Sequence, residues 1–270
     1  MPSVAEWNEH VVAFHDTYGD GTPGFVSRFR TADGLTSYEL LAARIRLGAR
    51  HDSRVLDVGC GSGELLRVLA ASIPHAVLEG IDLSERQLAL ARDAVPGARL
   101  VQGDAASLAF AERGYDAIAA HLSIMSMPHT EAILHALHRG LKPNGLLVLA
   151  TEDPLSGDSI VRGIAASLTH LAGRFPGSAF AIPERASIER DDVLRNALAA
   201  AGFSNVSLER VTLRAGIPVD DLWSAVEQTY PLGLLDYELR AWLRGKFIAD
   251  DGVKNSGEAT LALRFVFAYA

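Results

Sequence analysis

The chain is poor in cysteine and has no long apolar run: Cys60 is the only cysteine among 270 residues. A single cysteine excludes an internal disulfide. A membrane-spanning helix needs about 18 consecutive apolar residues, and no segment approaches this length. The first residues also lack the basic and apolar regions of a secretory signal. These absences predict a cytoplasmic protein without a membrane span.

Positive charge is also scarce, because 25 Lys and Arg residues stand against 33 Asp and Glu residues, for a net charge of −8. An acidic surface repels the phosphates of nucleic acids, so we expect no nucleic-acid partner. Hydrophobic residues make up 49% of the chain and charged residues 21%. This balance is typical of a globular protein that can bury a full core.

The most informative segment present is the run 55–66, in which an apolar strand ends in Asp57 and is followed by Gly59, Gly61 and Gly63. Glycine has no Cβ, so such a turn can adopt positive φ and its backbone can lie directly against a ligand. The pattern predicts a strand, a tight turn and the start of a helix. A glycine turn alone also occurs in dinucleotide-binding proteins and in many other α/β proteins, so it does not identify the ligand.

Two further predicted strands also end in acids. The first ends in Asp82, and Ser84 then serves as the N-cap of the next helix. The second ends at Asp104. Taken singly, each acid could be a solvated surface residue. Taken together, Asp82 can accept the ribose hydroxyls and Asp104 an adenine amino group, so the strand ends outline one adenosine.

Five ordered blocks resemble the class I S-adenosylmethionine-dependent methyltransferases, in particular the ubiquinone/menaquinone methyltransferase-like branch that acts on small molecules. The resemblance covers roughly residues 54–150. The blocks are Leu56–Gly63, Gly80–Ser84, Gly103–Ala105, Tyr115–Ile118 and Leu141–Val148. Five blocks in the correct order make chance agreement a poor explanation.

This resemblance implies that S-adenosylmethionine is the cofactor and assigns its contacts by position. The methionine end would be held by Asp57, Gly59, Cys60, Gly61 and Gly63, the ribose by Asp82, and the adenine by Leu83, Asp104 and Ala105. The family also uses an N-terminal helix to cover the cofactor, which would bring Tyr18 near the methionine carboxylate or the substrate. A packing role for Tyr18 is equally open. We interpret Cys60 as a small buried residue of the loop and not as a reactive thiol.

Strand and helix patterns alternate along the chain, which predicts an α/β fold with a doubly wound, mostly parallel sheet of seven strands. Strands are expected near 53–58, 77–81, 98–101, 114–120, 145–151, 205–213 and 259–268, and core helices near 63–73, 84–94, 129–139 and 191–201, the last closed by Gly202. The resemblance implies the strand order 3-2-1-4-5-7-6, with the last strand antiparallel. A homodimer is compatible with this fold.

Three segments lie outside this core pattern. Residues 1–50 are expected to form an N-terminal helical cover, with a helix over 7–18 before a Gly/Pro break at 19–24. Residues 51–270 would then form a Rossmann-like methyltransferase domain with lid insertions at about 152–190 and 216–255. We expect lid helices over 159–172, 219–230 and 235–248. Connections of this length are usually functional or disordered, and their apolar content favours packed lids.

Ligands of open parallel sheets bind beyond the carboxyl ends of the strands, where the strand order reverses. Here that point lies between the first and fourth strands, and the fourth strand delivers His121 to it. His121 could take a proton from the substrate, or it could only line the cofactor pocket, which is the interpretation we favour. His170, in the first lid insertion, could face the substrate or lie at the surface. Methyl transfer from a sulfonium needs mainly alignment, so a base is not required.

Two departures from related enzymes narrow the prediction. The segment after the fourth strand reads His121-Leu122-Ser123-Ile124 and lacks the Asn/Asp-Pro-Pro-aromatic motif of enzymes that methylate amino groups of bases or of glutamine. The fourth strand also ends in a histidine where magnesium-dependent catechol-type enzymes have an acid, so we expect no metal. The predicted function is methyl transfer from S-adenosylmethionine to O, C or N of a small, largely apolar biosynthetic metabolite. Alternatives are a cyclisation or rearrangement on the same fold and a nonenzymatic binding subunit.

Overall fold

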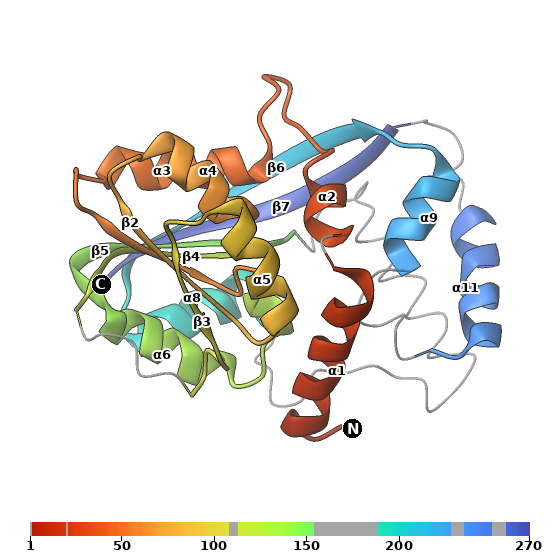
Figure 1. Ribbon diagram of the computed structural model, residues 1–270, viewed down its shortest axis with the longest axis horizontal. Coiled ribbons are helices and arrows are strands. Elements are labelled where there is room, and N and C mark those ends of the chain that lie inside the picture. The colour runs from red at the N-terminus through yellow and green to blue at the C-terminus, as the bar shows by residue number, and fades with distance from the viewer. Residues whose placement is uncertain are drawn as a thin grey trace.

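The computed structural model describes residues 2–19, 21–107, 113–153, 188, 190–227, 235–249 and 258–270. Its centre is a seven-stranded sheet in the order β3-β2-β1-β4-β5-β7-β6 (Figure 1). The strands are β1 (Arg54–Val58), β2 (Val77–Asp82), β3 (Arg99–Gln102), β4 (Tyr115–His121), β5 (Leu141–Glu152), β6 (Ser204–Gly216) and β7 (Glu258–Tyr269). β1 to β5 are parallel, and β7 runs antiparallel to both β5 and β6. The predicted fold class and strand order are therefore confirmed.

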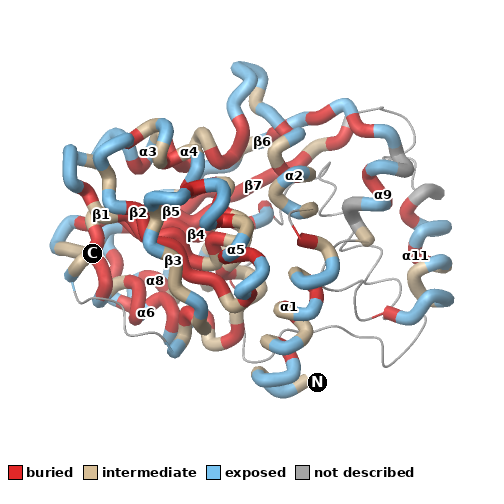
Figure 2. The backbone as a smooth tube through the Cα atoms, in the orientation of Figure 1, coloured by how far each residue is buried: buried red, intermediate tan, exposed pale blue. Residues whose placement is uncertain are grey.

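Helices cover both faces of the sheet, because successive strand residues point to opposite sides. Val55 of β1 belongs to one buried cluster and Leu56 to the other. The first cluster includes residues of α3 (Ser37–Gly48), α4 (Glu64–Ser72) and α5 (Glu85–Ala94), and the second includes residues of α6 (Thr130–Gly140) and α8 (Asp191–Ala201). Figure 2 shows this sandwich as buried strands between helices with exposed outer sides.

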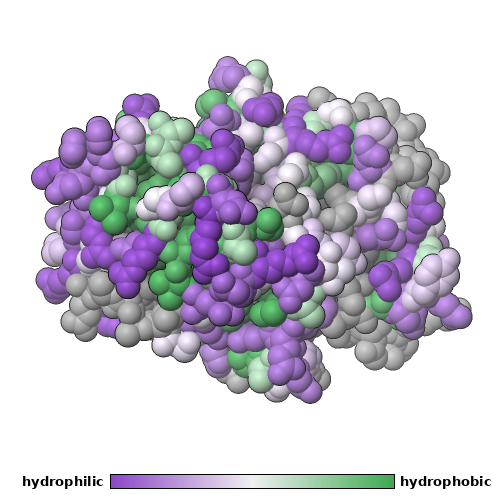
Figure 3. Space-filling model, in the orientation of Figure 1, coloured by the Kyte–Doolittle hydropathy of each residue, from purple (hydrophilic) through white to green (hydrophobic). Residues whose placement is uncertain are grey.

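Hydrophilic residues dominate the face of the molecule that Figure 3 presents, and hydrophobic residues appear between them in small groups. A surface of this kind is normal for a protein whose large apolar side chains lie in the interior.

Several helix ends lie where local chemistry predicts them. Ser84 is the N-cap of α5, and its side chain accepts a hydrogen bond from the Gln87 backbone. Gly202 follows α8 with a left-handed φ of 104°, and a Cβ there would lie 2.8 Å from the His138 ring. Thr36 and Glu39 form a capping box at the start of α3, a helix that the sequence analysis did not predict.

The N-terminal segment differs from the expected break at 19–24. α1 (Val4–Tyr18) begins at a capping box of Ser3 and Glu6, but a second short helix, α2 (Gly21–Val26), follows it. Pro23 is the third residue of α2, where backbone N–H groups have no intrahelical partner. Proline therefore removes no hydrogen bond there. α1 ends at Tyr18, so the break begins at Gly19 as expected, but it does not extend to residue 24 because residues 21–24 are helical.

The segment predicted to be the second lid insertion contains two helices close to the predicted positions, α9 (Val219–Glu227) and α11 (Tyr237–Ala249). Its role as a lid stays a prediction. They pack on one another, with the Trp223 and Phe247 rings 5.5 Å apart. The predicted helix over 159–172, most of the first insertion and the polar loop 250–257 lie outside the described residues. Among the helices that the structure describes, none has the length and apolar character that a bilayer crossing requires.

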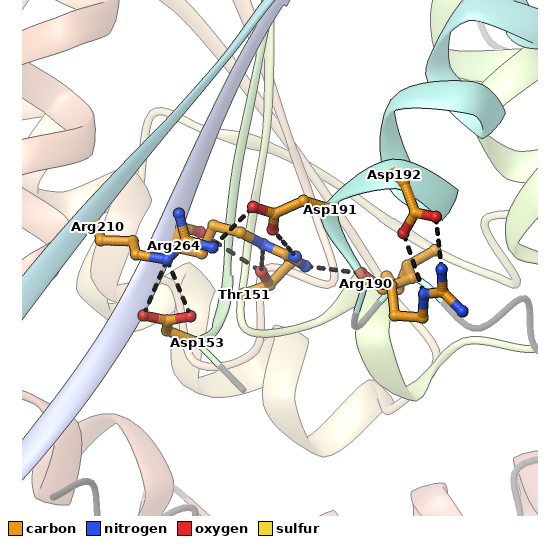
Figure 4. A network of polar contacts seen from close by, with 8 residues as sticks. Thr151, Asp153, Arg190, Asp191, Asp192, Arg210 and Arg264 are labelled. Atoms are coloured by element: carbon orange, nitrogen blue, oxygen red, sulfur yellow. Dashed lines mark hydrogen bonds and ion pairs between the residues drawn. The ribbon is translucent and has the colours of Figure 1, made fainter. Parts of the chain in front are cut away.

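A buried arginine joins the antiparallel end of the sheet to α8 (Figure 4). Arg264 of β7 is 1% exposed; its Nε donates to Thr151 at 3.2 Å, and its Nη1 lies 2.8 Å from Asp191. Arg210 of β6 pairs with Asp191 at 2.7 Å and with Asp153 at 3.3 Å. The network fixes the start of α8 against β5, β6 and β7.

Candidate functional site

The acids at the strand ends meet at one edge of the sheet, which we call the carboxyl edge: the ends of β1, β2 and β3 that carry Asp57, Asp82 and Asp104. β1 and β2 are parallel, with Asp57 opposite Gly80, and β2 and β3 are parallel, with Asp82 opposite Gln102. Asp57 and Asp82 are both buried. The three side chains that the sequence analysis singled out therefore lie at neighbouring strand ends.

The glycine loop after β1 is shaped by positive φ angles of 69° at Gly59, 52° at Gly61 and 86° at Gly63. The Gly59 N–H donates to the Ile81 carbonyl at 2.8 Å, which ties the loop to β2. A Cβ on Gly59 would lie 2.5 Å from the Cβ of Ser123, so a side chain does not fit there. The loop thus passes closely between β2 and the segment that follows β4.

Asp82 is held in place by two backbone groups. Its Oδ2 accepts a hydrogen bond from Gly61 N–H at 2.9 Å, and its Oδ1 accepts one from Ser84 N–H at 3.0 Å. Each carboxylate oxygen can accept a further hydrogen bond. The geometry leaves acceptor capacity for a ligand with neighbouring hydroxyl groups.

Asp57 is the unusual acid of the carboxyl edge. Its side chain is 2% exposed, and its Oδ1 is buried without a hydrogen-bond partner. Burial and the negative charge of Asp82 raise the pKa of Asp57 to about 8. An orphaned carboxyl oxygen of this kind costs free energy unless a ligand supplies a donor or a positive charge.

α3 brings two side chains to the end of β4 that the sequence analysis missed. His121 Nε2 lies 2.8 Å from the Ser37 hydroxyl, and its ring stacks on Tyr38 with 4.0 Å between centroids. Burial raises the pKa of Tyr38, so its phenol remains protonated. The capping box at Thr36 was a sequence signal for this helix start, but only the fold places its first turn beside β4.

Burial lowers the pKa of His121 to about 3. The imidazole is therefore neutral at physiological pH and is a weak proton acceptor, because efficient general bases have a pKa near the working pH. This favours the interpretation of His121 as a polar wall of the pocket over that of a catalytic base.

α1 crosses the carboxyl edge and is tied to it near both ends. Trp7 Nε1 donates to the Ser126 carbonyl at 2.9 Å, and Asn8 Nδ2 donates to Asp104 Oδ2 at 3.1 Å. Near the other end, Gln87 Nε2 donates to the Gly19 carbonyl at 2.5 Å. Tyr18 is half-buried against Phe14, with ring centroids 4.8 Å apart, and its contact with a ligand stays a prediction.

The remaining predicted site residues differ in their surroundings. Leu83 is half-buried next to Asp82, and Ala105 is buried after Asp104. Cys60 is also buried, and burial raises the pKa of its thiol, so it is unreactive. His170 lies outside the described residues. Within the part of the chain that the structure describes, no group of three or more His, Cys, Asp or Glu side chains could hold a metal ion.

A hollow of about 280 Å³ lies at the opposite edge of the sheet from the candidate site. Its lining includes Val55 and Asp116, the second residues of β1 and β4, and Leu146 in the first half of β5. The strand ends and the glycine loop do not contribute to it, so it is separate from the candidate site.

Comparison with known proteins places the central part of the chain in a family. Residues 55–145 match the family described as "Methyltransferase domain". Trans-aconitate 2-methyltransferase of Methylobacterium nodulans is 38% identical over 119 residues, which cover 44% of this chain and 45% of that protein. Malonyl-acyl-carrier-protein O-methyltransferase of Methylococcus capsulatus is 30% identical over 183 residues, covering 67% of this chain and 62% of that protein. The chain spans about half the length of most of the curated relatives it matches.

Solved structures share the fold over a greater length. A methyltransferase-like protein of Bacillus halodurans superimposes with a TM-score of 0.56 at 18% identity, covering 84% of this chain and 97% of that chain. The [4+2]-cyclase SpnF superimposes with a TM-score of 0.62 at 18% identity, covering 97% and 96%. At this identity the likeness concerns the fold alone. Together with the ordered motifs, the sequence matches show that residues 55–145 belong to a class I S-adenosylmethionine-dependent methyltransferase domain.

Proposed function

We propose that this protein transfers the methyl group of S-adenosylmethionine to an oxygen, carbon or nitrogen atom of a small, largely apolar metabolite. The observation that carries the proposal is the buried, unpartnered carboxyl oxygen of Asp57 beside the glycine loop. No Lys or Arg of the described residues forms an ion pair with Asp57, Asp82 or Asp104. A site with several acceptor oxygens and no cation of its own suits a ligand that brings donors and positive charge.

The residues present fit this cofactor group by group. Asp57 and the backbone of the glycine loop would accept the ammonium of the methionine end. Asp82, already oriented by Gly61 and Ser84, would accept the ribose hydroxyls with its remaining lone pairs. Asp104 and the Ala105 backbone would lie at the adenine edge, with Leu83 against one face of the ring.

The cofactor supplies an activated methyl carbon, so the task of the protein is alignment and exclusion of water. α1 and α3 cover the carboxyl edge through the contacts of Trp7, Asn8 and Ser37. The neutral His121 ring adds no positive charge to a site that receives a sulfonium. Its Nε2 is occupied by the Ser37 hydroxyl, and that hydroxyl, held in place by the ring, can orient a polar group of the acceptor without removing a proton.

The acceptor is the least defined part of the proposal. Two matched relatives are named for trans-aconitate and for malonyl-acyl-carrier protein, so their names do not point to one common acceptor. In this chain, α9 and α11 lie between the end of β6 and the start of β7 and contribute Trp223, Leu243 and Phe247 to the buried core. The apolar character of this segment is the reason for proposing a mainly apolar acceptor.

Calorimetric titration of the purified protein with S-adenosylmethionine and S-adenosylhomocysteine tests the cofactor. We expect saturable binding of both that is lost in Asp82→Ala and retained in Asp93→Ala, which removes an exposed carboxylate of the same region. Absence of binding to either compound by the unaltered protein would refute the proposal.

Because a cyclase shares this fold, the second test follows the methyl group itself. The protein is incubated with methyl-labelled S-adenosylmethionine and fractions of small apolar metabolites. We expect label in a product together with a stoichiometric amount of S-adenosylhomocysteine. Turnover of a metabolite with the labelled cofactor recovered intact would contradict methyl transfer.

A further inference from the structure

One polar side chain of α1 that reaches the carboxyl edge belongs to Asn8, which lies outside the segment 55–145 that matches the methyltransferase family. Asn8 Nδ2 donates a hydrogen bond to Asp104 Oδ2 at 3.1 Å, although 96 residues separate the two in sequence. The Trp7 indole, one residue earlier, is 1% exposed and is bonded to the Ser126 carbonyl. Asn8 is therefore held in place by a buried neighbour on the same helix turn.

The other end of the Asn8 amide has no partner. Its Oδ1 is buried and accepts no hydrogen bond. The orientation of the amide follows from its chemistry, since turning it over would set the amide oxygen against the carboxylate oxygen of Asp104, and two acceptors repel. The orphaned acceptor is thus a consequence of the contact with Asp104. Buried acceptors are normally hydrogen-bonded, so a ligand bound here would be expected to supply a donor to this oxygen.

The neighbouring carboxylate is only partly occupied. Asp104 Oδ1 accepts the Ala106 N–H at 2.8 Å, and Oδ2 accepts from Asn8. Each oxygen retains a second lone pair. The end of β3 therefore offers two kinds of acceptor close together, a carboxylate oxygen and an amide oxygen, from two different elements of the fold.

We infer that Asn8 reads the adenine amino group of the cofactor together with Asp104, with the amide oxygen accepting one amino hydrogen and the carboxylate the other. An exocyclic amino group carries two N–H donors, whereas the carbonyl of hypoxanthine at the same position carries none. The pair therefore selects an aminopurine and rejects an oxopurine. This inference rests on the proposed function, because it requires the adenosine to lie at the carboxyl edge.

The test compares calorimetric affinities for S-adenosylhomocysteine and S-inosylhomocysteine; in the second compound a carbonyl replaces the amino group at this purine position, and the neighbouring ring nitrogen N1 carries a hydrogen. We expect the unaltered protein to prefer the adenosyl compound by about 100-fold or more, since a buried acceptor facing a carbonyl is left unpaired. Asn8→Leu removes the amide at similar volume. It should weaken adenosyl binding by roughly 10-fold, the usual value of one hydrogen bond in a buried site, and leave inosyl binding nearly unchanged.

Two variants serve as controls. Glu9→Gln, next to Asn8 on an exposed position of α1, should leave both affinities unchanged. If Asn8→Leu does not fold, Asn8→Ser removes the same amide with a smaller side chain. An equal loss of affinity for both ligands, or no loss for either, would overturn the inference.

The double variant Asn8→Leu/Asp104→Asn distinguishes two roles of Asn8: direct contact with the purine amino group, and positioning of the Asp104 carboxylate. If Asn8 acts only by holding Asp104, the double variant and Asp104→Asn have the same preference between the two ligands, and the inference fails. A further drop in preference supports direct reading. Failure of the unaltered protein to bind S-adenosylhomocysteine would instead refute the proposed function, so the two failures are distinct.

Discussion

The two edges of the parallel sheet carry similar acids in opposite circumstances. At the edge where the strands begin, which we call the amino edge, buried Glu79 pairs with Arg54 and accepts a hydrogen bond from the Tyr115 hydroxyl at 3.1 Å. Asp116 at the same edge pairs with Lys142 at 2.7 Å. At the carboxyl edge, by contrast, no Lys or Arg of the described chain pairs with the strand-end acids, and a buried oxygen of Asp57 has no partner.

This difference distinguishes acids that stabilise the fold from acids whose hydrogen bonds a ligand would complete. A buried carboxylate is tolerated when its charge and lone pairs are satisfied within the protein. One that is left unsatisfied by the protein alone costs stability, and a ligand that completes it recovers the cost as binding. Substitutions at the two edges should therefore affect different measurements.

The largest loss of stability is expected at the amino edge. Glu79→Gln leaves Arg54 without its charged partner, and breaking a buried ion pair from one side typically costs about 3–5 kcal/mol. Arg54 is partly exposed, so we expect the lower end, about 3 kcal/mol of unfolding free energy, measured by urea denaturation. Cofactor affinity should not change. The exposed acid Glu209, paired with Arg44, offers a control, since Glu209→Gln should cost less than about 1 kcal/mol. A large loss of cofactor affinity in Glu79→Gln would break the contrast between the edges.

The largest effect on binding is expected at Asp82. The carboxylate of Asp82 accepts hydrogen bonds from the backbone N–H groups of Gly61 and Ser84. Asp82→Asn would place an amide donor opposite at least one of these N–H groups, so that hydrogen bond would be lost. Hydrogen bonds to charged groups contribute about 1.5–3 kcal/mol, so the cofactor dissociation constant should rise at least about 10-fold. Calorimetry measures this change, and urea denaturation of the same variant should show a loss of only about 1 kcal/mol. An unaltered affinity would show that Asp82 is a structural acid, like those of the amino edge.

Substitution of Asp57 should change the stability of the free protein in the opposite direction, by raising it. Its folded-state pKa of about 8 lies above the value near 3.9 of an unfolded chain. The folded state therefore binds more protons, so the stability of the free protein falls as pH rises from about 4 to about 8. Asp57→Asn removes this dependence. We expect the variant to gain roughly 3–4 kcal/mol relative to the unaltered protein as the pH rises from 5 to 8 in urea denaturation. Parallel pH dependences of the two proteins would contradict this reasoning.

A smaller expected effect concerns the number of protons that Asp57 releases when the cofactor binds. If Asp57 meets the ammonium of the cofactor, binding stabilises its charged form and lowers its pKa below about 8. Cofactor binding at pH 7 should then release about one proton from Asp57, and calorimetry in two buffers of different ionisation enthalpy measures this release. Asp57→Asn should release none. Equal proton release by both proteins would assign it to another group.

The smallest effect is expected at His121. Because its pKa is about 3, the ring does not titrate between pH 5 and pH 8. Over this range, the pH profile of the methyl-transfer rate should therefore have the same shape in the unaltered protein and in His121→Gln. The variant should lose less than about 10-fold in kcat, which is the value of an orienting hydrogen bond. An inflection near pH 6 present only in the unaltered protein would restore His121 as a general base.

The sequence by itself determined the features that depend on neighbours along the chain. The strand order came from the resemblance to the family. The strands, the glycine loop and the ends of α5 and α8 follow instead from local rules: short apolar runs, positive φ, an N-cap at Ser84 and a left-handed Gly202. The local rules failed at Pro23, where the first turn of a helix accepts proline.

Only the tertiary structure decided which distant side chains meet. Ser37 lies 84 residues from His121, Asn8 lies 96 residues from Asp104, and Arg264 lies 113 residues from Thr151. None of these pairs has a spacing that secondary structure dictates. They form because packing of α1, α3 and β7 on the sheet buries polar groups that must then find partners, and Asp57 and Asn8 remain the two acceptors at the carboxyl edge for which the described residues provide none.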